Sequence, residues 1–313
     1  MLISVYWACY FISKAMNLRS DDDFNTIEQN ENFLIFSSLR TFYHPIQSRG
    51  FSIKYVTEGT ERYTLDGHKY PIEAGQYLLS NSCVAGYVEI ESSKQVKGIC
   101  INLKPELLTE VVATQQRPDA AFSDLELGQF FGSAFFLENQ YNAQQTQLGQ
   151  LLRALAKAIE QPDFDKETLD MAFFYHLSEK LIADQAPVFK QLRAVPSVKT
   201  ATKKALYRQV LRGQAMIDAC FELPLSIEAV AQEACMSEYH FFRVFKAAFG
   251  QTPHQYLTKK RLENGLLLLQ QDRNSVYDVA IQSGFFDIYS FSKAFKKHFG
   301  FAPSSVGKTS RIW

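Results

Sequence analysis

The chain has 313 residues, which is long enough for two domains with separate hydrophobic cores. It carries 33 basic and 33 acidic residues in total; residues 187–313 hold 18 basic and 9 acidic ones, which leaves 15 and 24 for residues 1–186. A basic part beside an acidic part favours contact with a polyanion, although a solvated lysine-rich face is the alternative. Five scattered cysteines (Cys9, Cys83, Cys100, Cys220 and Cys235) form no CxxC pair, which argues against a disulfide framework and against a zinc cluster.

The first residues, MLISVYWACYFIS, are apolar over a stretch too short to span a bilayer. They lack a basic n-region and a small-residue cleavage site, which a secretory signal peptide requires. We therefore expect residues 1–24 to be an amino-terminal extension, with Met16 as an alternative start, and no membrane contact. Because the cysteines form no predicted disulfide framework, we also expect reduced thiols and a cytoplasmic location.

Residues 33–103 are predicted to form strands, because they consist of short β-branched and aromatic runs separated by glycine-containing turns. Asp66-Gly67 is typical of a two-residue hairpin turn. Several short strands at regular spacing indicate a small barrel or sandwich, which we place at residues 25–110. The inward face of one strand holds either Phe51, Ile53 and Tyr55 or Ser52, Lys54 and Val56, and the sequence leaves this open.

Residues 111–186 are predicted to be helical. Leu148, Leu151, Leu152, Leu155 and Ile159 follow helical spacing, and a second such pattern runs from Met171 to Ile182. Such helices either pack on the barrel or pair two chains, or do both. Residues 187–204 contain two prolines and little periodicity, and we expect a linker there.

The last third of the chain repeats itself. Val230 and Ala231 correspond to Val279 and Ala280 at an offset of 49 residues, whereas FFRVFKAAFGQTP from Phe241 corresponds to FSKAFKKHFGFAP from Phe291 at an offset of 50. The extra residue of the second copy falls in the turn, ACMS against SGFFD. Each copy is predicted to be a short helix, a tight turn and a longer helix that ends at glycine and proline.

The details of each copy are typical of a helix-turn-helix motif. Ala231 and Ala280 are small where two helices must cross. Ser237 and Asp287 are predicted to cap the second helix of each copy, and Ser275 with Asp278 forms the capping pattern of the first helix in the second copy. Phenylalanines at i, i+4 and i+8 form an apolar stripe, Phe241, Phe245 and Phe249 in one copy and Phe291, Phe295 and Phe299 in the other.

Residues off these stripes are the candidates for nucleic-acid contact. They are Tyr239, Phe242, Arg243 and Lys246 with His240 at the edge in the first copy, and Ile288, Tyr289, Ser292, Lys293, Lys296 and Lys297 in the second; the caps Ser237 and Asp287 complete the set. A helix in the major groove needs long donors toward bases and phosphates. Arg243 can bind guanine O6 and N7, Lys293 is the matching point charge, and Phe242 can contact a thymine methyl. For any one of them alone, a solvated surface residue, or a core position for Phe242, is the alternative.

These motifs resemble the AraC/XylS family of bacterial transcription regulators over about residues 211–308. SFSKAFKKHFGFAPSSV matches the family's closing run, and HFFRVFKAAFGQTPHQYLTKKRLENGLLLL matches its first motif and connecting helix. The resemblance implies a DNA-binding domain at residues 205–313, with motifs at about 226–249 and 275–299. It places Tyr239, Phe242 and Arg243, and Tyr289, Ser292 and Lys293, in base-contacting slots. Three residues depart from the pattern: Cys235 where the turn usually has glycine, Gly265 in the connecting helix, and Phe242 at a usually polar position.

The amino-terminal part resembles the cupin-like sensing domain of the same family in its strand rhythm, YVTEGTERYTLDGHKYPIEAGQYLLS. The metal-ligand pattern of cupin enzymes is missing, since Ser52 stands in the carboxylate slot and His44 and His68 are isolated. The expected fold class is thus α+β and multidomain, with a cupin-like barrel, a helical dimerisation segment and an all-α double helix-turn-helix domain.

The resemblance implies a transcription regulator that acts as an activator. It is expected to bind double-stranded DNA and a small-molecule effector, to form a homodimer and to contact RNA polymerase. We expect no catalytic residues, metal or cofactor, and the effector-binding residues are unknown. The alternatives are an enzyme of the cupin type with a DNA-binding tail, and a ligand-sensing protein that regulates through protein contacts alone.

Overall fold

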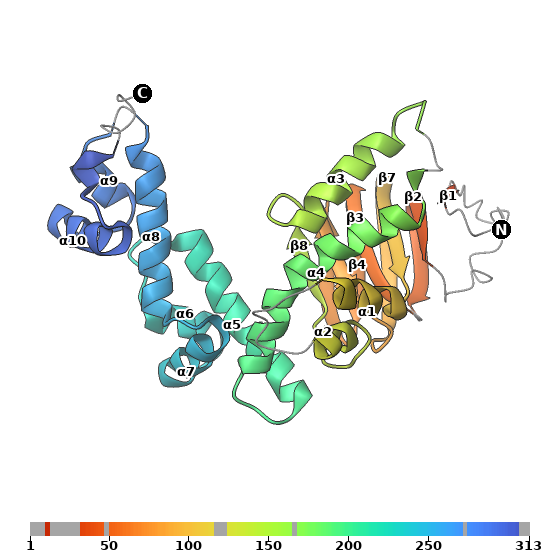
Figure 1. Ribbon diagram of the computed structural model, residues 1–313, viewed down its shortest axis with the longest axis horizontal. Helices are drawn as coiled ribbons and strands as arrows, with labels where there is room; N and C mark the ends of the chain where they lie inside the picture. Colours follow the sequence, from red (N-terminus) through yellow and green to blue (C-terminus); the bar gives the residue numbers. More distant parts are fainter. Residues whose placement is uncertain are drawn as a thin grey trace. The chain divides into compact units, whose positions relative to one another are not determined.

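The computed structural model describes residues 10–12, 32–46, 50–115, 124–164, 168–271 and 274–306. The chain divides into two compact units, Met1–Lys190 and Gln191–Trp313 (Figure 1), and each is described by itself. Most of the extension expected at residues 1–24 lies outside the described residues. Its described part, β1 (Tyr10–Ile12), pairs antiparallel with β2.

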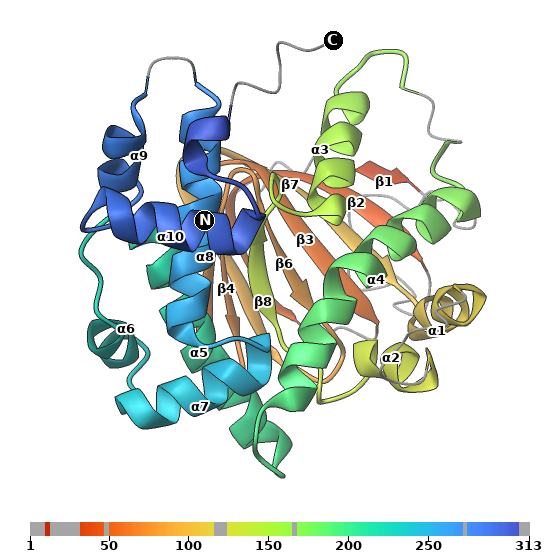
Figure 2. The same ribbon diagram turned by 60° about the vertical axis from the view of Figure 1, so that its left-hand side comes forward.

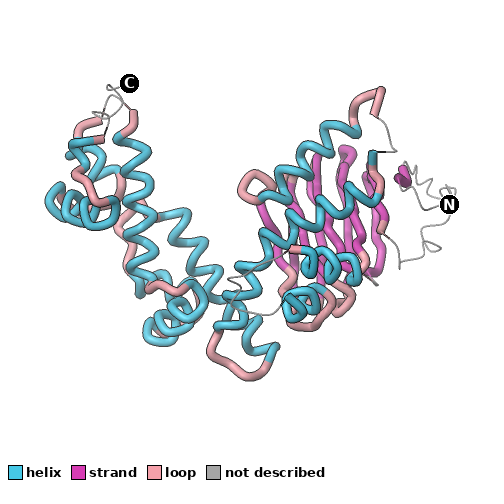
Figure 3. Tube along the Cα trace, viewed as in Figure 1, coloured by secondary structure: helices cyan, strands magenta, loops and turns pink. Residues whose placement is uncertain are grey.

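The first unit is built on an antiparallel sheet that forms a nearly closed barrel. Its further strands, drawn in magenta in Figure 3, are β2 (Phe33–Ile46), β3 (Phe51–Glu58), β4 (Thr60–Leu65), β5 (His68–Glu73), β6 (Gln76–Ser80), β7 (Gly86–Leu103) and β8 (Asn139–Asn142). The long strand β7 pairs with β2 on one side. On its other side it pairs first with β4 and then with β3, so the sheet curves around it.

The hairpin between β4 and β5 confirms the predicted turn. Asp66 and Gly67 have φ angles of 46° and 79°, and Leu65 pairs with His68 across the turn. Positive φ at both central residues is the geometry that matches the twist of a two-residue hairpin.

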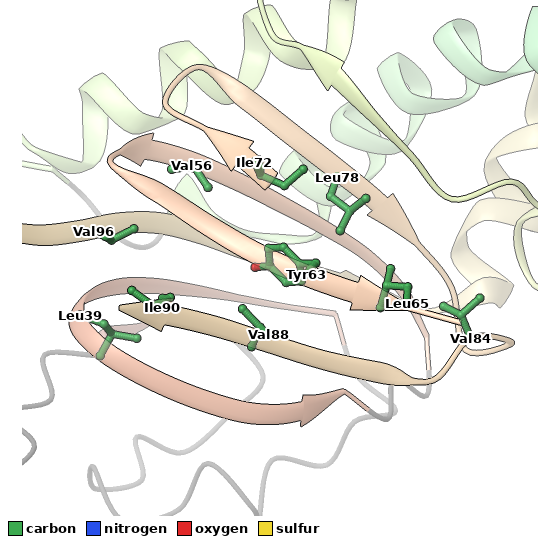
Figure 4. Close-up of a cluster of buried hydrophobic side chains, with 10 residues drawn as sticks. All are labelled: Leu39, Val56, Tyr63, Leu65, Ile72, Leu78, Val84, Val88, Ile90 and Val96. Carbon is green, nitrogen blue, oxygen red and sulfur yellow. The ribbon is translucent and has the colours of Figure 1, made fainter. Parts of the chain in front are cut away.

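The barrel encloses a cluster of buried apolar side chains drawn from six strands and from the loop before β7 (Figure 4). Its members are Leu39, Val56, Tyr63, Leu65, Ile72, Leu78, Val84, Val88, Ile90 and Val96. Val56 of β3 belongs to this enclosed cluster. Because successive side chains of a strand alternate between faces, Ser52 and Lys54 lie on the same inner face as Val56. Phe51, on the other face, packs edge-on against Phe136 at 4.9 Å between ring centroids. The question that the sequence left open is therefore answered in favour of Ser52, Lys54 and Val56.

Four helices belong to the part of the chain that follows β7. They are α1 (Pro105–Thr114), α2 (Asp124–Phe131), α3 (Gln147–Ile159) and α4 (Met171–Ala194). Figures 1 and 2 show α3 and α4 lying over one face of the sheet. The two amphipathic helices predicted from helical spacing, one at Leu148–Ile159 and one from Met171 to Ile182, are confirmed as α3 and α4. The prediction of a purely helical segment is wrong at β8, which adds a strand beside β6.

Most of residues 187–204, where we expect a linker, are helical, and the boundary between the two units at Lys190 and Gln191 falls among them. Helix α4 continues through Pro187 to Ala194, and α5 begins at Thr200. Pro187 removes a hydrogen bond to the carbonyl of Ala183, but both residues are exposed, so water can satisfy that carbonyl. Buried Phe189 and Leu192 hold the last turns of α4 in place.

The second unit consists of helices only, within its described residues. They are α5 (Thr200–Cys220), α6 (Ile227–Glu233), α7 (Glu238–Phe249), α8 (Pro253–Leu269), α9 (Val276–Gln282) and α10 (Ile288–Phe299), followed by the short 3-10 helix η3 (Pro303–Ser305). Helix α6 and α7 lie at one end of α8, and α9 and α10 at the other (Figure 2). Helix α5 packs on the first pair as α8 packs on the second.

The helix that packs against each motif, α5 for the first and α8 for the second, carries a glycine at the contact. The structural repeat therefore comprises three helices, because this preceding helix belongs to it. A Cβ atom at Gly213 of α5 would lie 2.5 Å from Cε2 of Phe241, and one at Gly265 of α8 would lie 2.8 Å from Cε2 of Phe291. The phenylalanine that opens each apolar stripe therefore lies directly on a helix backbone. Gly265, a departure from the family pattern in the sequence, is the counterpart of Gly213 and makes room for the ring.

Within the described residues, no helix has the length and apolar character needed to cross a membrane.

Candidate nucleic-acid interface

The turns of the two motifs share one backbone conformation. Cys235 has a φ of 53° and Gly284, at the corresponding position, a φ of 82°. This left-handed region suits glycine, and a residue with a Cβ atom is strained there by about 1–2 kcal/mol. Cys235, which stands where the family's turn usually has glycine, adopts this conformation, so the first turn keeps its geometry despite a less suitable residue.

The second helix of each motif, α7 in the first and α10 in the second, begins at its predicted cap. The hydroxyl of Ser237 accepts a hydrogen bond from the backbone N–H of His240, and Asp287 Oδ1 accepts one from the N–H of Ser290 at 2.7 Å. These bonds to the backbone and hydroxyl of Ser290 lower the pKa of Asp287. Fixed caps define where each helix starts, and hence which side chains its first turn presents.

The apolar stripes are buried as predicted. Phe241 and Phe245 are fully buried in the first copy, as are Phe291 and Phe295 in the second, while Phe249 and Phe299 are half-buried. Corresponding rings lie at nearly equal distances, 4.5 Å between Phe245 and Phe249 and 4.5 Å between Phe295 and Phe299. Because the same stripe faces inward in both copies, the same opposite face of each helix is exposed.

The candidate residues lie on these outer faces. Ten are exposed: Ser237, Tyr239, Phe242, Arg243, Lys246, Ile288, Tyr289, Lys293, Lys296 and Lys297. Three are half-buried: His240, Asp287 and Ser292. Tyr239 and Tyr289 keep 77% and 73% of their surface accessible. Such large aromatic side chains in water favour a surface that is covered in a complex.

The cationic side chains of α7 and α10 have no acidic partner among the described residues. This applies to Arg243, Lys246, Lys293, Lys296 and Lys297. On α8, by contrast, Lys260 lies 2.8 Å from Asp218 and Lys259 lies 3.7 Å from Glu263. Unpaired cations on two matched helix faces are the arrangement that phosphate groups can neutralise.

Helix α8 is tied to α5 by polar contacts that sequence reasoning missed. Arg261 donates to the carbonyls of Phe221 and Leu223, at 2.7 and 2.9 Å, and so satisfies the carboxyl end of α5. The Tyr256 hydroxyl bonds to Asp218, which also pairs with Lys260. These contacts hold the two motifs at a set spacing within the second unit. The run KKRLEN was the available signal, but a basic run alone does not distinguish a positioning role from a surface role.

The barrel interior holds a small polar group beside its apolar cluster. Glu61 is buried and accepts a hydrogen bond from the hydroxyl of Tyr63, and Lys54 Nζ donates to Cys100 Sγ at 2.6 Å. Burial raises the pKa of Glu61, which the Tyr63 hydrogen bond and the Lys54 charge partly oppose. Burial, with the same lysine, lowers the pKa of His44. Among the described residues, no three metal-ligating side chains come together.

Both units match models of known protein families. Residues 36–178 match the AraC-like ligand binding domain, and residues 230–309 match a helix-turn-helix domain. Over 103 residues the chain is 40% identical to the uncharacterised HTH-type transcriptional regulator YidL of Escherichia coli (strain K12), a match that covers 33% of this chain and 35% of that regulator. The chain spans about a third of the length of the curated relatives it matches.

Solved structures give two further similarities. An AraC-type transcriptional regulator from Chromobacterium violaceum is 25% identical, with a TM-score of 0.32, over 34% of this chain and 95% of that one. ToxT from Vibrio cholerae strain SCE256, solved with a bound unsaturated fatty acid, is 13% identical, with a TM-score of 0.36, over 89% and 95%.

The family models thus cover the two units separately, and each bears out the fold class expected for its part, a cupin-like barrel and a double helix-turn-helix. The curated relatives that the chain matches are named as regulators of transcription. The chain belongs to the AraC/XylS family of transcriptional regulators.

Proposed function

We propose that this chain is a sequence-specific DNA-binding regulator of transcription whose two recognition helices, α7 and α10, enter the major groove of double-stranded DNA. The observation that carries the proposal is the pair of matched outer faces. Each face is rich in exposed aromatic and cationic side chains, and its cations have no acidic partner among the described residues. Two such helices tied to one connecting helix fit successive turns of the groove, about 34 Å apart.

The candidate residues are divided by the part of the DNA that each is proposed to contact. Tyr239, Phe242 and Arg243 on α7, and Tyr289, Ser292 and Lys293 on α10, are proposed to reach base edges. Ile288 is proposed to offer apolar surface to the groove at the start of α10. The others are proposed to contact phosphate groups or to set the helix start: Ser237, His240, Lys246, Asp287, Lys296 and Lys297. An arginine contact to guanine contributes about 1–3 kcal/mol to discrimination, whereas a phosphate contact strengthens binding on every sequence.

The first unit is proposed to control this binding through a small-molecule effector. Its support is the match of residues 36–178 to a ligand-binding domain and the polar group of Lys54, Glu61, Tyr63 and Cys100 beside the apolar interior. We further propose that the chain works in the cytoplasm as a homodimeric activator that contacts RNA polymerase. Sedimentation of the full chain tests the dimer, and transcription from its binding site with purified polymerase tests the activation.

Selection of binding sites from a random DNA pool tests the central part of this proposal. The full chain should enrich one sequence, and its affinity should fall steeply with salt, because phosphate contacts release counterions. Arg243→Ala should lose about 10-fold to 100-fold in affinity for that sequence and relax the preference at one base position. Lys259→Ala is the control, since Lys259 lies on α8 and is paired with Glu263. If the pool shows no enrichment over random sequence, the proposal is wrong.

A further inference from the structure

The second copy has one residue more than the first, and the backbone hydrogen bonds of the two turns identify that residue. In the first turn the N–H of Met236 donates to the carbonyl of Ala231, at 2.9 Å, and in the second the N–H of Phe285 donates to that of Ala280, at 3.0 Å. Phe285 is therefore the counterpart of Met236. The extra residue is Phe286, which directly precedes the cap Asp287 and has no counterpart in the first copy.

Phe286 does not serve the core. Its side chain is 95% exposed, whereas Phe285 is half-buried and packs edge-on against Phe291 at 5.3 Å between ring centroids. A fully exposed phenylalanine adds apolar surface to water and brings the folded chain no packing in return. Its position at the start of a recognition helix therefore points to a contact made in a complex.

Two neighbours extend the apolar surface around Phe286. Ile288 is 41% exposed and Tyr289 is 73% exposed. The position that corresponds to Ile288 in the first copy is Glu238, also in the first turn of its helix. The amino-terminal end of α10 is thus apolar, whereas that of α7 carries a charge. The two helices are otherwise alike, since each has a side-chain cap and a buried phenylalanine stripe.

The charge of α10 indicates what covers this apolar end. Lys293, Lys296 and Lys297 lie on the same helix, exposed and without an acidic partner among the described residues. A partner must therefore offer negative charge beside apolar groups. The DNA major groove offers both, because the thymine C5-methyl is its one apolar group and phosphates line its edges.

We propose that the second recognition helix reads thymine methyl groups, with Phe286 and Ile288 as the methyl-contacting residues, while the first helix reads guanine through Arg243. This assignment rests on the proposed DNA-binding function and deepens it. It predicts an asymmetric site, with a guanine-dependent half and a thymine-dependent half about one helical turn apart.

Replacing thymine by deoxyuridine tests the assignment, because it removes the methyl group and keeps the base pair. In the half-site one turn from the guanine contacted by Arg243, the wild-type chain should lose roughly fourfold in affinity for each contacted methyl. Phe286→Ala should bind the thymine site more weakly and be nearly insensitive to the replacement. Leu267→Ala, which removes an exposed apolar side chain on α8, should keep the wild-type sensitivity.

The outcomes separate this inference from the function on which it rests. The chain could bind a specific site through Arg243, while replacement of thymine by deoxyuridine lowers the affinity equally in the wild type and in Phe286→Ala. This result overturns only the methyl assignment. A Phe286→Ala variant that binds DNA normally but fails to activate purified RNA polymerase also overturns it, in favour of a protein contact. A chain with no sequence preference at all overturns the proposed function. Because Phe286 lies outside the core, an unchanged melting curve should show that the variant is folded.

Discussion

The second unit contains two three-helix copies, α5 to α7 and α8 to α10. The two copies have the same internal contacts but differ in the side chains that they expose. In both, a glycine in the packing helix accepts a phenylalanine ring, a residue with positive φ makes the turn, and a hydroxyl or carboxylate caps the recognition helix. The outer faces diverge at Glu238 against Ile288, at Arg243 against Lys293, and at the extra Phe286. The comparison teaches that packing constrains the buried side of such a motif, while the exposed side is free to vary.

The largest expected effect tests whether the two cores are equivalent. Phe241→Ala and Phe291→Ala should each lower the free energy of unfolding of the second unit by about 3–5 kcal/mol, because each empties a fully buried ring site on a glycine. Phe286→Ala, on an exposed side chain, should change it by less than about 0.5 kcal/mol. Urea denaturation followed by circular dichroism measures all three. A small effect at Phe291 alone would show that the second copy is held together differently.

The turns should respond in opposite directions to exchange of glycine. Gly284→Ala should destabilise by about 2–3 kcal/mol, since its Cβ atom would lie in the left-handed region and 2.7 Å from the carbonyl of Phe221. Cys235→Gly should stabilise by up to about 1 kcal/mol, because it relieves strain at a φ of 53°. Thermal unfolding of both variants measures the difference. If Cys235→Gly lowered the stability, or Gly284→Ala left it unchanged, the two turns would not share one backbone conformation.

The caps should separate the copies by their response to acid. The pKa of Asp287 is lowered in the folded chain by the Ser290 hydrogen bonds, so its contribution is present above the unfolded pKa and is lost as the pH falls through the folded value. Ser237 does not titrate. Below a pH of about 4, amide exchange at the start of α10 should therefore accelerate more than at the start of α7. In Asp287→Asn, which can cap without titrating, that difference should disappear; parallel acceleration in the wild type would contradict the account.

Sequence patterns were most informative where a physical requirement repeats along the chain. The helix-turn-helix copies follow from matched phenylalanines, caps and closing glycines, and the barrel from its strand rhythm and from Asp66-Gly67. Strand β8 was missed because Asn139–Asn142 is short and polar, and pairing with β6 rather than its own pattern makes it a strand. The continuation of α4 was missed because Pro187 and the buried, polar Gln185 interrupt an apolar pattern that Phe189 and Leu192 resume.

The candidate interface was predictable as a set of residues but not as a surface. The sequence names the side chains off each stripe. The structure adds which of them are exposed and which cations have no acidic partner in the part of the chain that it describes. Phe286 escaped because two adjacent phenylalanines look alike in the sequence. The backbone bond from Phe285 to Ala280 and the contact of Phe285 with Phe291 distinguish the packed ring from the exposed one. The polar group around Glu61 escaped because the fold brings Lys54 of β3 and Cys100 of β7 beside Glu61 and Tyr63 of β4.

The most direct test of the account is site selection from a random pool by the wild type, Arg243→Ala and Lys293→Ala in parallel. If both helices read DNA, each variant should relax the preference at its own base position, and the two positions should lie about one helical turn, roughly 10 base pairs, apart. A uniform loss of affinity in both variants, with every base preference kept, would contradict the claim that these two helices are the reading elements.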